Sequence, residues 1–243
     1  MSSNRMRTRE RRRAREQQSR RQRQMLLLAA VVVIAAVAVL AYVITSQPAE
    51  APVSDAVFAS YEGIPHSETD EGFPLLGDPA APVQVSEISS FDCPSCGNFY
   101  RTVTPALIER VKTGDISFVY IPIFGTGGIP NGEGANRAAL CAGEQDRFWE
   151  YHGALFEWQL TYANQAFASN RLASGVDNLG IDRAAWDACM ASGRPDDVIR
   201  AANTLVSRTE GFRGTPSVLV DGVMVDSTLA GIEAAIASAL VSG

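Results

Sequence analysis

The sequence predicts an α/β domain that follows a single N-terminal transmembrane helix. An uncharged, apolar run of 20 residues, Met25–Ile44, is long enough to span a bilayer as a helix. After it, strand-like and helix-like segments follow in the order strand, helix, strand, a helical block, strand, strand and helix. The four cysteines also lie beyond the apolar run. The chain of 243 residues therefore has room for one sizeable domain after the membrane segment.

The charge distribution predicts the orientation of the membrane helix. Residues 1–24 form a basic arm with ten arginines and two glutamates, a net charge of +8, whereas the rest of the chain carries −14. Arginine clusters beside a transmembrane helix stay in the cytoplasm. We therefore expect a cytoplasmic arm over 1–24, a membrane helix over 25–44 and an extracytoplasmic remainder, and no binding of nucleic acid. The apolar run is longer than that of a cleaved signal peptide, which favours an uncleaved anchor.

The next segments predict a tether and then a strand–helix–strand unit. Residues 45–72 are rich in Pro, Ala, Ser and acidic residues without a sustained period, which is typical of a flexible tether. The runs Val83–Phe91 and Ile116–Ile123 are predicted to be buried strands. Between them, Pro94–Lys112 has the pattern of a helix that Pro105 kinks. Such a short crossover predicts that the two strands pair in parallel.

The remaining segments predict a helical insertion, a hairpin and a final helix. From about 133 to 211, apolar residues recur at helical spacing, and Asp182 and Asp196 stand where helix-capping residues would. An Asp-Gly dipeptide at 221–222 then separates two short apolar runs, which is the signature of a two-residue hairpin. The final helix is predicted over Ser227–Leu240.

The motif "DCPSC" carries the chemistry that the sequence predicts. Its two cysteines, Cys93 and Cys96, follow a strand and begin a helix. A zinc site needs four ligands, and the other cysteines and both histidines stand singly and far along the chain, so we expect no metal. At a helix N-terminus, free backbone N–H groups and the helix dipole stabilise a thiolate. We therefore expect a redox pair, with Cys93 as the nucleophile and Cys96 as the resolving thiol.

The segments "LLGDPAAPV", "VSEISSFDCPSC" and "GTPSVLVDG" resemble those of the DsbA-like thiol:disulfide oxidoreductases of the thioredoxin superfamily. The resemblance covers about residues 73–241 and implies a thioredoxin-like fold with a helical insertion. It also implies a cis bond before Pro216, next to the cysteine pair, and a Thr215 backbone that binds extended substrates. Glu87 matches the family's buried acid beneath the disulfide, which would exchange a proton with Cys96.

The resemblance also bears on the second pair of cysteines. Related sequences often carry such a pair in the helical insertion, which implies a structural disulfide between Cys141 and Cys189. Two free, buried thiols are the alternative. A disulfide that closes a loop of this length would stabilise the fold by roughly 4 kcal/mol in the chain-entropy model.

By resemblance, we expect a dithiol oxidase that introduces disulfides into exported proteins. Its partners would be exported protein thiols and a quinone-linked membrane thiol oxidase of the DsbB or VKOR type, and it would need no cofactor of its own. Ser95 stands where well-known oxidases have a histidine, so Cys93 lacks a neighbouring cation, which favours a less oxidising disulfide. Two alternatives stay open: a membrane-anchored disulfide reductase or isomerase, and a peptide-binding module whose cysteines are structural.

Overall fold

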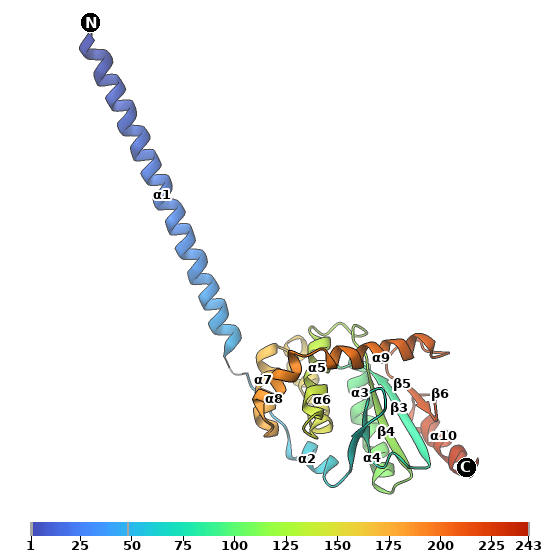
Figure 1. Ribbon diagram of the computed structural model, residues 1–243. Coiled ribbons are helices and arrows are strands. Elements are labelled where there is room, and N and C mark those ends of the chain that lie inside the picture. The colour runs from blue at the N-terminus through green and yellow to red at the C-terminus, as the bar shows by residue number, and fades with distance from the viewer. Residues whose placement is uncertain (1, 48, 243) are drawn as a thin grey trace. The chain divides into compact units, whose positions relative to one another are not determined.

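The computed structural model describes the backbone of residues 2–47 and 49–242 and the side chains of residues 20–44, 47 and 49–241. The chain separates into two compact units, one that ends at Gln47 and one that follows it (Figure 1). The first unit is a single helix, α1 (Ser2–Ser46). Its stretch Arg20–Ile44 contains an 18-residue window with a mean hydropathy of 3.1 and is long and apolar enough to cross a membrane. The helix also continues through the basic arm, because Arg, Gln and Glu are strong helix formers.

The folded domain begins earlier than the sequence predicts, and the tether predicted over 45–72 is wrong for most of its length. Helix α2 (Asp55–Tyr61) and strand β1 (His66–Glu68) lie within it. Ser54 caps α2 by accepting a hydrogen bond from the N–H of Val57, and the Val57 side chain is buried. Val57 and Tyr61, the two buried residues of α2, lie one turn apart and are enough to dock so short a helix. Two residues are too few to show a helical period in the sequence.

The core of the domain is a six-stranded sheet with the strand order β1-β2-β4-β3-β5-β6. Its central strands, β3 (Val83–Ser89) and β4 (Ile116–Pro122), pair in parallel, as the strand–helix–strand pattern predicts. The other strand pairs are antiparallel. The sequence did not reveal β1 or the buried strand β2 (Pro74–Leu76), because three residues are too few to show an alternation.

The predicted hairpin is confirmed at the far edge of the sheet. Strands β5 (Ser217–Val220) and β6 (Val223–Val225) pair across a two-residue turn. Both turn residues, Asp221 and Gly222, have positive φ, as this type of turn requires. The Asp221 carboxylate also accepts a hydrogen bond from the Gln84 N–H at 2.8 Å, which ties the turn to β3.

Pro105 divides the long helix that the sequence predicts, instead of only kinking it. Helix α3 (Pro94–Thr102) ends at Val103, and α4 (Thr104–Lys112) begins directly afterwards. Proline has no N–H to donate to the carbonyl of Arg101, and its ring clashes with that carbonyl. Proline is well tolerated in a first helical turn, so a new helix starts at this point.

The predicted helical insertion between β4 and β5 is confirmed. Its elements are α5 (Gly132–Gly143), α6 (Phe148–Tyr162), the short 3-10 helix η1 (Ala163–Gln165), α7 (Ser169–Leu179), α8 (Arg183–Met190) and α9 (Arg194–Arg208). Asp182 caps α8, because its carboxylate accepts the Ala185 N–H at 2.8 Å. The capping role predicted for Asp196 is wrong. Pro195 already lies in the first turn of α9, and Asp196 follows it inside the helix.

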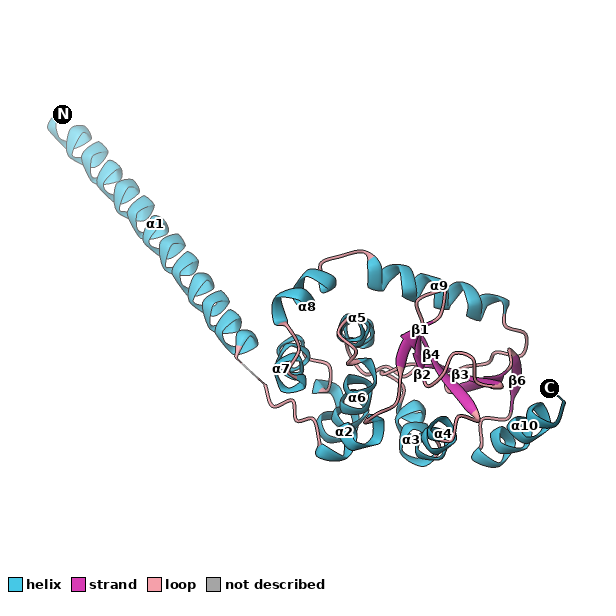
Figure 2. Cartoon of the chain, turned by 60° about the horizontal axis from the view of Figure 1, so that its bottom comes forward, coloured by secondary structure: helices cyan, strands magenta, loops and turns pink. Residues whose placement is uncertain are grey.

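The helices form two layers on the sheet and a separate group beside it. Figure 2 shows α3, α4 and α10 (Leu229–Ser242) below the sheet in that view and α9 above it. Accordingly, α4 and α9 both contact β4, and α10 contacts β3, β5 and β6. Helix α6 packs against α3, α5 and α2, so the insertion rests on the first helix after β3. This packing brings the insertion next to the cysteine motif.

Candidate active site

Cys93 lies at the N-terminus of α3, directly after the loop that leaves β3. Its backbone is extended, with φ −97° and ψ 115°, and Pro94 occupies the first helical turn. The N–H of Cys96 donates to the Cys93 carbonyl at 3.1 Å. Both cysteines are free thiols; Cys96 is fully buried and Cys93 is 5% exposed. The structure thus places the first cysteine of the motif nearer to solvent than the second.

The surroundings lower the pKa of Cys93 and raise that of Cys96. Hydrogen bonding with the Cys96 thiol is the largest influence on Cys93. Together with hydrogen bonds from Thr215 and from the backbone of Cys96 and Ser95, it lowers the pKa of Cys93 to about 5, although burial acts in the opposite direction. Burial, followed by hydrogen bonding with Cys93 and the charge of Glu87, raises the pKa of Cys96 well above its ordinary value. Near neutral pH, Cys93 is therefore a thiolate and Cys96 a thiol.

The loop between α9 and β5 brings Thr215 to Cys93. The Cys93 Sγ lies 3.5 Å from the Thr215 carbonyl oxygen, so a protonated Cys93 thiol can donate to it. The peptide bond between Thr215 and Pro216 is cis. The fold therefore unites the cysteine motif with a Thr-Pro motif that lies 122 residues further along the chain.

Glu87 lies in the middle of β3 and is almost completely buried. It stands in register with Tyr120 of β4 and Val218 of β5. Burial is the main cause that raises the pKa of Glu87 to about 8; the nearby Ser89 hydroxyl lowers it, and the charge of Cys93 raises it. Within the part of the chain that the structure describes, its Oε1 has no hydrogen-bond partner. The carboxyl group is thus mostly protonated at neutral pH and can exchange a proton.

Ser89 and Tyr120 are buried polar neighbours that sequence reasoning missed. Ser89 follows Glu87 by two residues in β3, so the two side chains point to the same face of the sheet. The Ser89 hydroxyl lowers the pKa of both Glu87 and Cys96, although its Oγ has no hydrogen-bond partner among the residues that the structure describes. Burial raises the pKa of Tyr120, and the charges of Glu87 and Cys96 raise it further. The Ser89 hydroxyl thus lies near both Glu87 and Cys96. The only sign of it in the sequence is a polar residue two positions after Glu87.

Gln159 of α6 holds the backbone of the cysteine motif from the helical insertion. Its Nε2 donates to the carbonyl oxygens of Phe91 at 2.6 Å and Cys93 at 3.0 Å. A Cβ at position 97 would lie 1.9 Å from its Oε1, so Gly97 leaves the space in which the Gln159 amide makes these two hydrogen bonds. Nothing in the sequence pattern indicates this contact, because it joins residues that are 66 positions apart.

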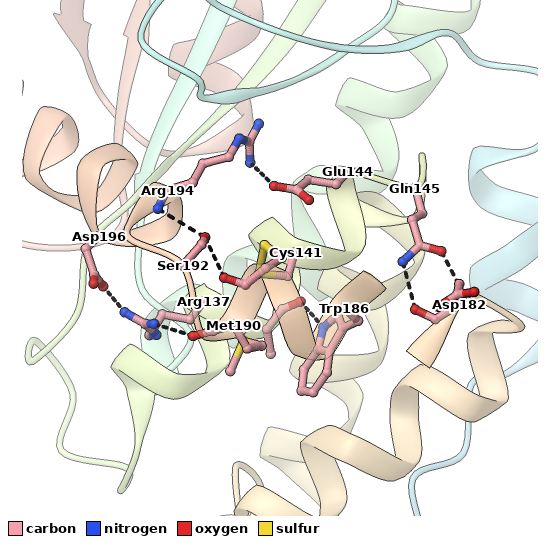
Figure 3. The surroundings of a disulfide bond; sticks show 12 residues. Arg137, Cys141, Glu144, Gln145, Asp182, Trp186, Met190, Ser192, Arg194 and Asp196 are labelled. Carbon is pink, nitrogen blue, oxygen red and sulfur yellow. Dashed lines mark hydrogen bonds and ion pairs between the residues drawn. A yellow bond between two sulfur atoms is a disulfide. The ribbon is translucent and has the colours of Figure 1, made fainter. Parts of the chain in front are cut away.

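The second pair of cysteines forms a disulfide that joins α5 to α8 (Figure 3). Cys141 is fully buried and Cys189 is 5% exposed. Beside the bridge, the Trp186 indole N–H of α8 donates to the Ala138 carbonyl of α5 at 3.0 Å. The bond therefore fastens two helices of the insertion to each other.

Comparisons with known proteins identify the family. A family model described as Thioredoxin matches residues 69–238. Disulfide bond formation protein D of Bacillus subtilis is 34% identical over 95 residues, which are 37% of this chain and 40% of that protein. The chain spans about half the length of the curated relatives it matches.

Two solved structures share the fold and confirm the predicted fold class. The crystal structure of oxidised BdbD from Bacillus subtilis matches with a TM-score of 0.62 and 22% identity, and covers 72% of this chain and 96% of that one. MdbA, a thiol-disulfide oxidoreductase from Corynebacterium diphtheriae, matches with a TM-score of 0.60 and 18% identity, over 76% of this chain and 99% of that one. At these identities the likeness establishes a thioredoxin-like fold with inserted helices.

Proposed function

The chain belongs to the thioredoxin family, and from this premise we propose that it is a membrane-anchored thiol:disulfide oxidoreductase of the DsbA type. In this proposal it acts as a dithiol oxidase that introduces disulfides into exported proteins. The observation that carries the proposal is the contrast between its two motif cysteines. Cys93 is a thiol of lowered pKa at a helix N-terminus, and its neighbour Cys96 is buried with a raised pKa.

The proposed reaction starts from the oxidised pair. A substrate thiolate attacks the Cys93 sulfur, the Cys93–Cys96 bond breaks, and its electron pair goes to the Cys96 sulfur, which takes up a proton. The second substrate thiolate attacks the substrate sulfur of this mixed disulfide and releases Cys93 as a thiolate. Two electrons pass from the substrate to the enzyme. One of the two substrate protons is balanced by the proton on Cys96, and the other goes to solvent because Cys93 stays ionised.

Glu87 is proposed to supply the proton that Cys96 takes up. Its carboxyl group is buried and mostly protonated at neutral pH, and its charge influences the pKa of Cys96. A carboxyl group with a pKa near the working pH can both give and regain a proton. The Ser89 hydroxyl, which influences both groups, supports a short route between them.

Thr215 and Pro216 are proposed to bind the substrate. The Thr215 backbone lies beside the Cys93 sulfur, where a substrate cysteine has to arrive. An extended peptide can bind there by pairing its backbone with Thr215, as in strand addition. Pro216 offers no N–H of its own, so the Thr215 side of the loop would provide the pairing groups.

Helix α1 supports the proposed location of the enzyme. Its apolar stretch would anchor the chain, and the basic arm before it would stay in the cytoplasm, with the catalytic domain outside. The proposed oxidase must pass its two electrons on after each turnover. We assign this reoxidation to a quinone-linked membrane thiol oxidase of the DsbB or VKOR type, which the anchor would keep in the same membrane.

The first test is the reduction potential of the Cys93–Cys96 pair. The full chain in detergent micelles is equilibrated with glutathione redox buffers, and the fraction of free Cys93 is measured. A potential above about −180 mV supports the oxidase. A potential near or below about −270 mV contradicts it and favours an anchored reductase.

The second test distinguishes an enzyme from a peptide-binding module. The Cys96→Ser variant lacks the resolving thiol, so a catalytic Cys93 should accumulate mixed disulfides with exported proteins. The matched control is the double variant Cys93→Ser, Cys96→Ser, which can form none. Absence of mixed disulfides in the single variant would rule out the proposed nucleophile.

A further inference from the structure

Asp92, the residue before Cys93, is a buried carboxylate that binds a neighbouring loop. It is 4% exposed. Its oxygens accept hydrogen bonds from the backbone N–H groups of Gly125 at 2.6 Å, Gly127 at 3.2 Å and Thr126 at 3.3 Å, and from the Ser90 hydroxyl. Hydrogen bonds to an ionised acceptor are stronger than those between neutral groups. Asp92 therefore holds three consecutive residues of one loop.

This loop, Phe124–Ile129, lies directly against the backbone of the nucleophile. The N–H of Ile129 donates to the Asp92 carbonyl at 3.3 Å. A Cβ at position 127 would lie 2.0 Å from the Asp92 carbonyl oxygen and 2.3 Å from the Cys93 Cα, so only glycine fits there. The backbone of the Phe124–Ile129 loop is thus packed directly against the backbone of Cys93.

The outer face of the same loop reaches the substrate-binding residue. The hydroxyl groups of Thr126 and Thr215 lie 2.7 Å apart and share a hydrogen bond. The Thr215 carbonyl in turn lies 3.5 Å from the Cys93 sulfur. Asp92, the loop, Thr215 and Cys93 therefore form a closed ring of contacts that passes through the Cys93 sulfur, which substrates must reach.

We propose that Asp92 is a positioning residue and that the Phe124–Ile129 loop, through Thr126, holds Thr215 in place for polypeptide substrates. The ring thus determines the preference for protein thiols over small thiols. This inference rests on the proposed function. A polypeptide needs the Thr215 backbone in a fixed position beside Cys93, whereas a small dithiol needs only the Cys93 sulfur. Groups held in place before binding increase the rate for the ligand that uses them.

The exposure of the loop favours positioning over packing. Gly125 to Gly128 are exposed, and Phe124 is 39% exposed. The Thr126–Thr215 hydrogen bond is also exposed, and water competes for such a bond, so it adds little to folding. This hydrogen bond joins the loop to Thr215, as a role in positioning Thr215 requires.

The experiment compares two substrates of the full chain in detergent. One is a reduced peptide with two cysteines, and the other is dithiothreitol; the second-order rate constant of oxidation is measured for each. The Thr126→Val variant keeps the size of the side chain and removes the hydroxyl bond. The ratio of the peptide rate to the dithiothreitol rate is expected to fall roughly fivefold, as for the loss of one modest hydrogen bond. The matched control is Thr204→Val, whose hydroxyl bonds the Arg200 carbonyl one turn back in α9.

Asp92→Asn is the second variant, because it releases the loop without changing its sequence. An amide cannot accept all the hydrogen bonds that the carboxylate accepts. Hydrogen exchange at Gly125–Gly127 is expected to become at least about tenfold faster, and the rate ratio to fall at least as far as in Thr126→Val. If hydrogen exchange becomes faster in Asp92→Asn but the ratio of the peptide rate to the dithiothreitol rate stays unchanged in both variants, the proposal is overturned. The ring of contacts would then have only a structural role. If the wild-type chain oxidises neither substrate, the proposed function fails instead.

Discussion

The two cysteine pairs of this domain differ in chemistry although their exposure is nearly the same. Cys93 and Cys189 are both 5% exposed, and Cys96 and Cys141 are both fully buried. One pair consists of free thiols three residues apart, and the other is a disulfide with a sequence separation of 48. Burial alone therefore does not explain why one pair consists of free thiols and the other is bridged.

The difference lies in the helix ends at which the sulfurs stand. Cys93 precedes the first turn of α3, where hydrogen bonding with the Cys96 thiol, and to a smaller extent with Thr215 and the backbone N–H groups of Cys96 and Ser95, lowers its pKa. Cys141 and Cys189 lie in the last turns of α5 and α8, where the helix dipole has its negative end. The free backbone groups at that end of a helix are carbonyls, and free N–H groups, which would stabilise a leaving sulfur, lie at the other end. A disulfide is thus expected to exchange rapidly between Cys93 and Cys96 and to persist between Cys141 and Cys189.

The largest expected effect is on the rate of peptide oxidation, which substitutions in the two cysteine pairs should change very differently. Cys93→Ser should lower the rate of peptide oxidation by at least about 1000-fold, because it removes the nucleophile. The double variant Cys141→Ala, Cys189→Ala should stay within about threefold of the wild type, since this pair joins α5 to α8 whereas Cys93 and Cys96 lie at the start of α3. Both rates are measured with the reduced two-cysteine peptide. A large loss in the double variant would mean that the second pair takes part in electron transfer.

The second effect separates the pairs by stability. Removal of the Cys141–Cys189 disulfide should lower the free energy of unfolding by roughly 4 kcal/mol, because the bridge restricts the unfolded chain. The substitutions are made in a Cys93→Ala, Cys96→Ala background, so that only one disulfide is at stake, and urea unfolding is measured. A loss below about 1 kcal/mol would show that the bridge adds little to the packing of α5 on α8.

The third effect is the pH dependence of alkylation, which should distinguish Cys93 from an ordinary thiol. The pKa of Cys93 is lowered to about 5, so its alkylation by iodoacetamide should rise with pH up to a midpoint near 5 and then level off. An ordinary thiol continues to gain about tenfold per pH unit up to its higher pKa. At pH 6, Cys93 should react roughly tenfold faster than such a thiol, after allowance for the weaker nucleophilicity of a low-pKa thiolate. A midpoint near 9 would contradict the stabilisation of the Cys93 thiolate by hydrogen bonding with Cys96, Thr215 and the backbone.

The sequence predicted the parts of the site that local chemistry determines. The spacing of Cys93 and Cys96 after a strand was visible, as was the Thr-Pro motif before the closing hairpin. The contacts of Gln159 and Asp92 were not, because they join segments that are far apart in the chain and leave no periodic trace. The predicted tether failed for a related reason, since α2 and β1 owe their structure to the domain they dock on. Local patterns therefore indicated the cysteines that are proposed to react, and tertiary contacts identified what holds them.

The smallest effect concerns α8, the helix that carries Cys189, and compares two aspartates that look alike in the sequence. Asp182 accepts the Ala185 N–H and caps α8, so Asp182→Ala should lower the free energy of unfolding by about 1 kcal/mol. Asp196 instead lies inside α9 and forms an ion pair with Arg137, in which its side chain is 43% exposed. Such a pair is screened by water, so Asp196→Ala should cost only about 0.5 kcal/mol. Urea unfolding of both variants gives the two values, and a larger loss for Asp196→Ala would show that the ion pair contributes more to the insertion than the cap of α8.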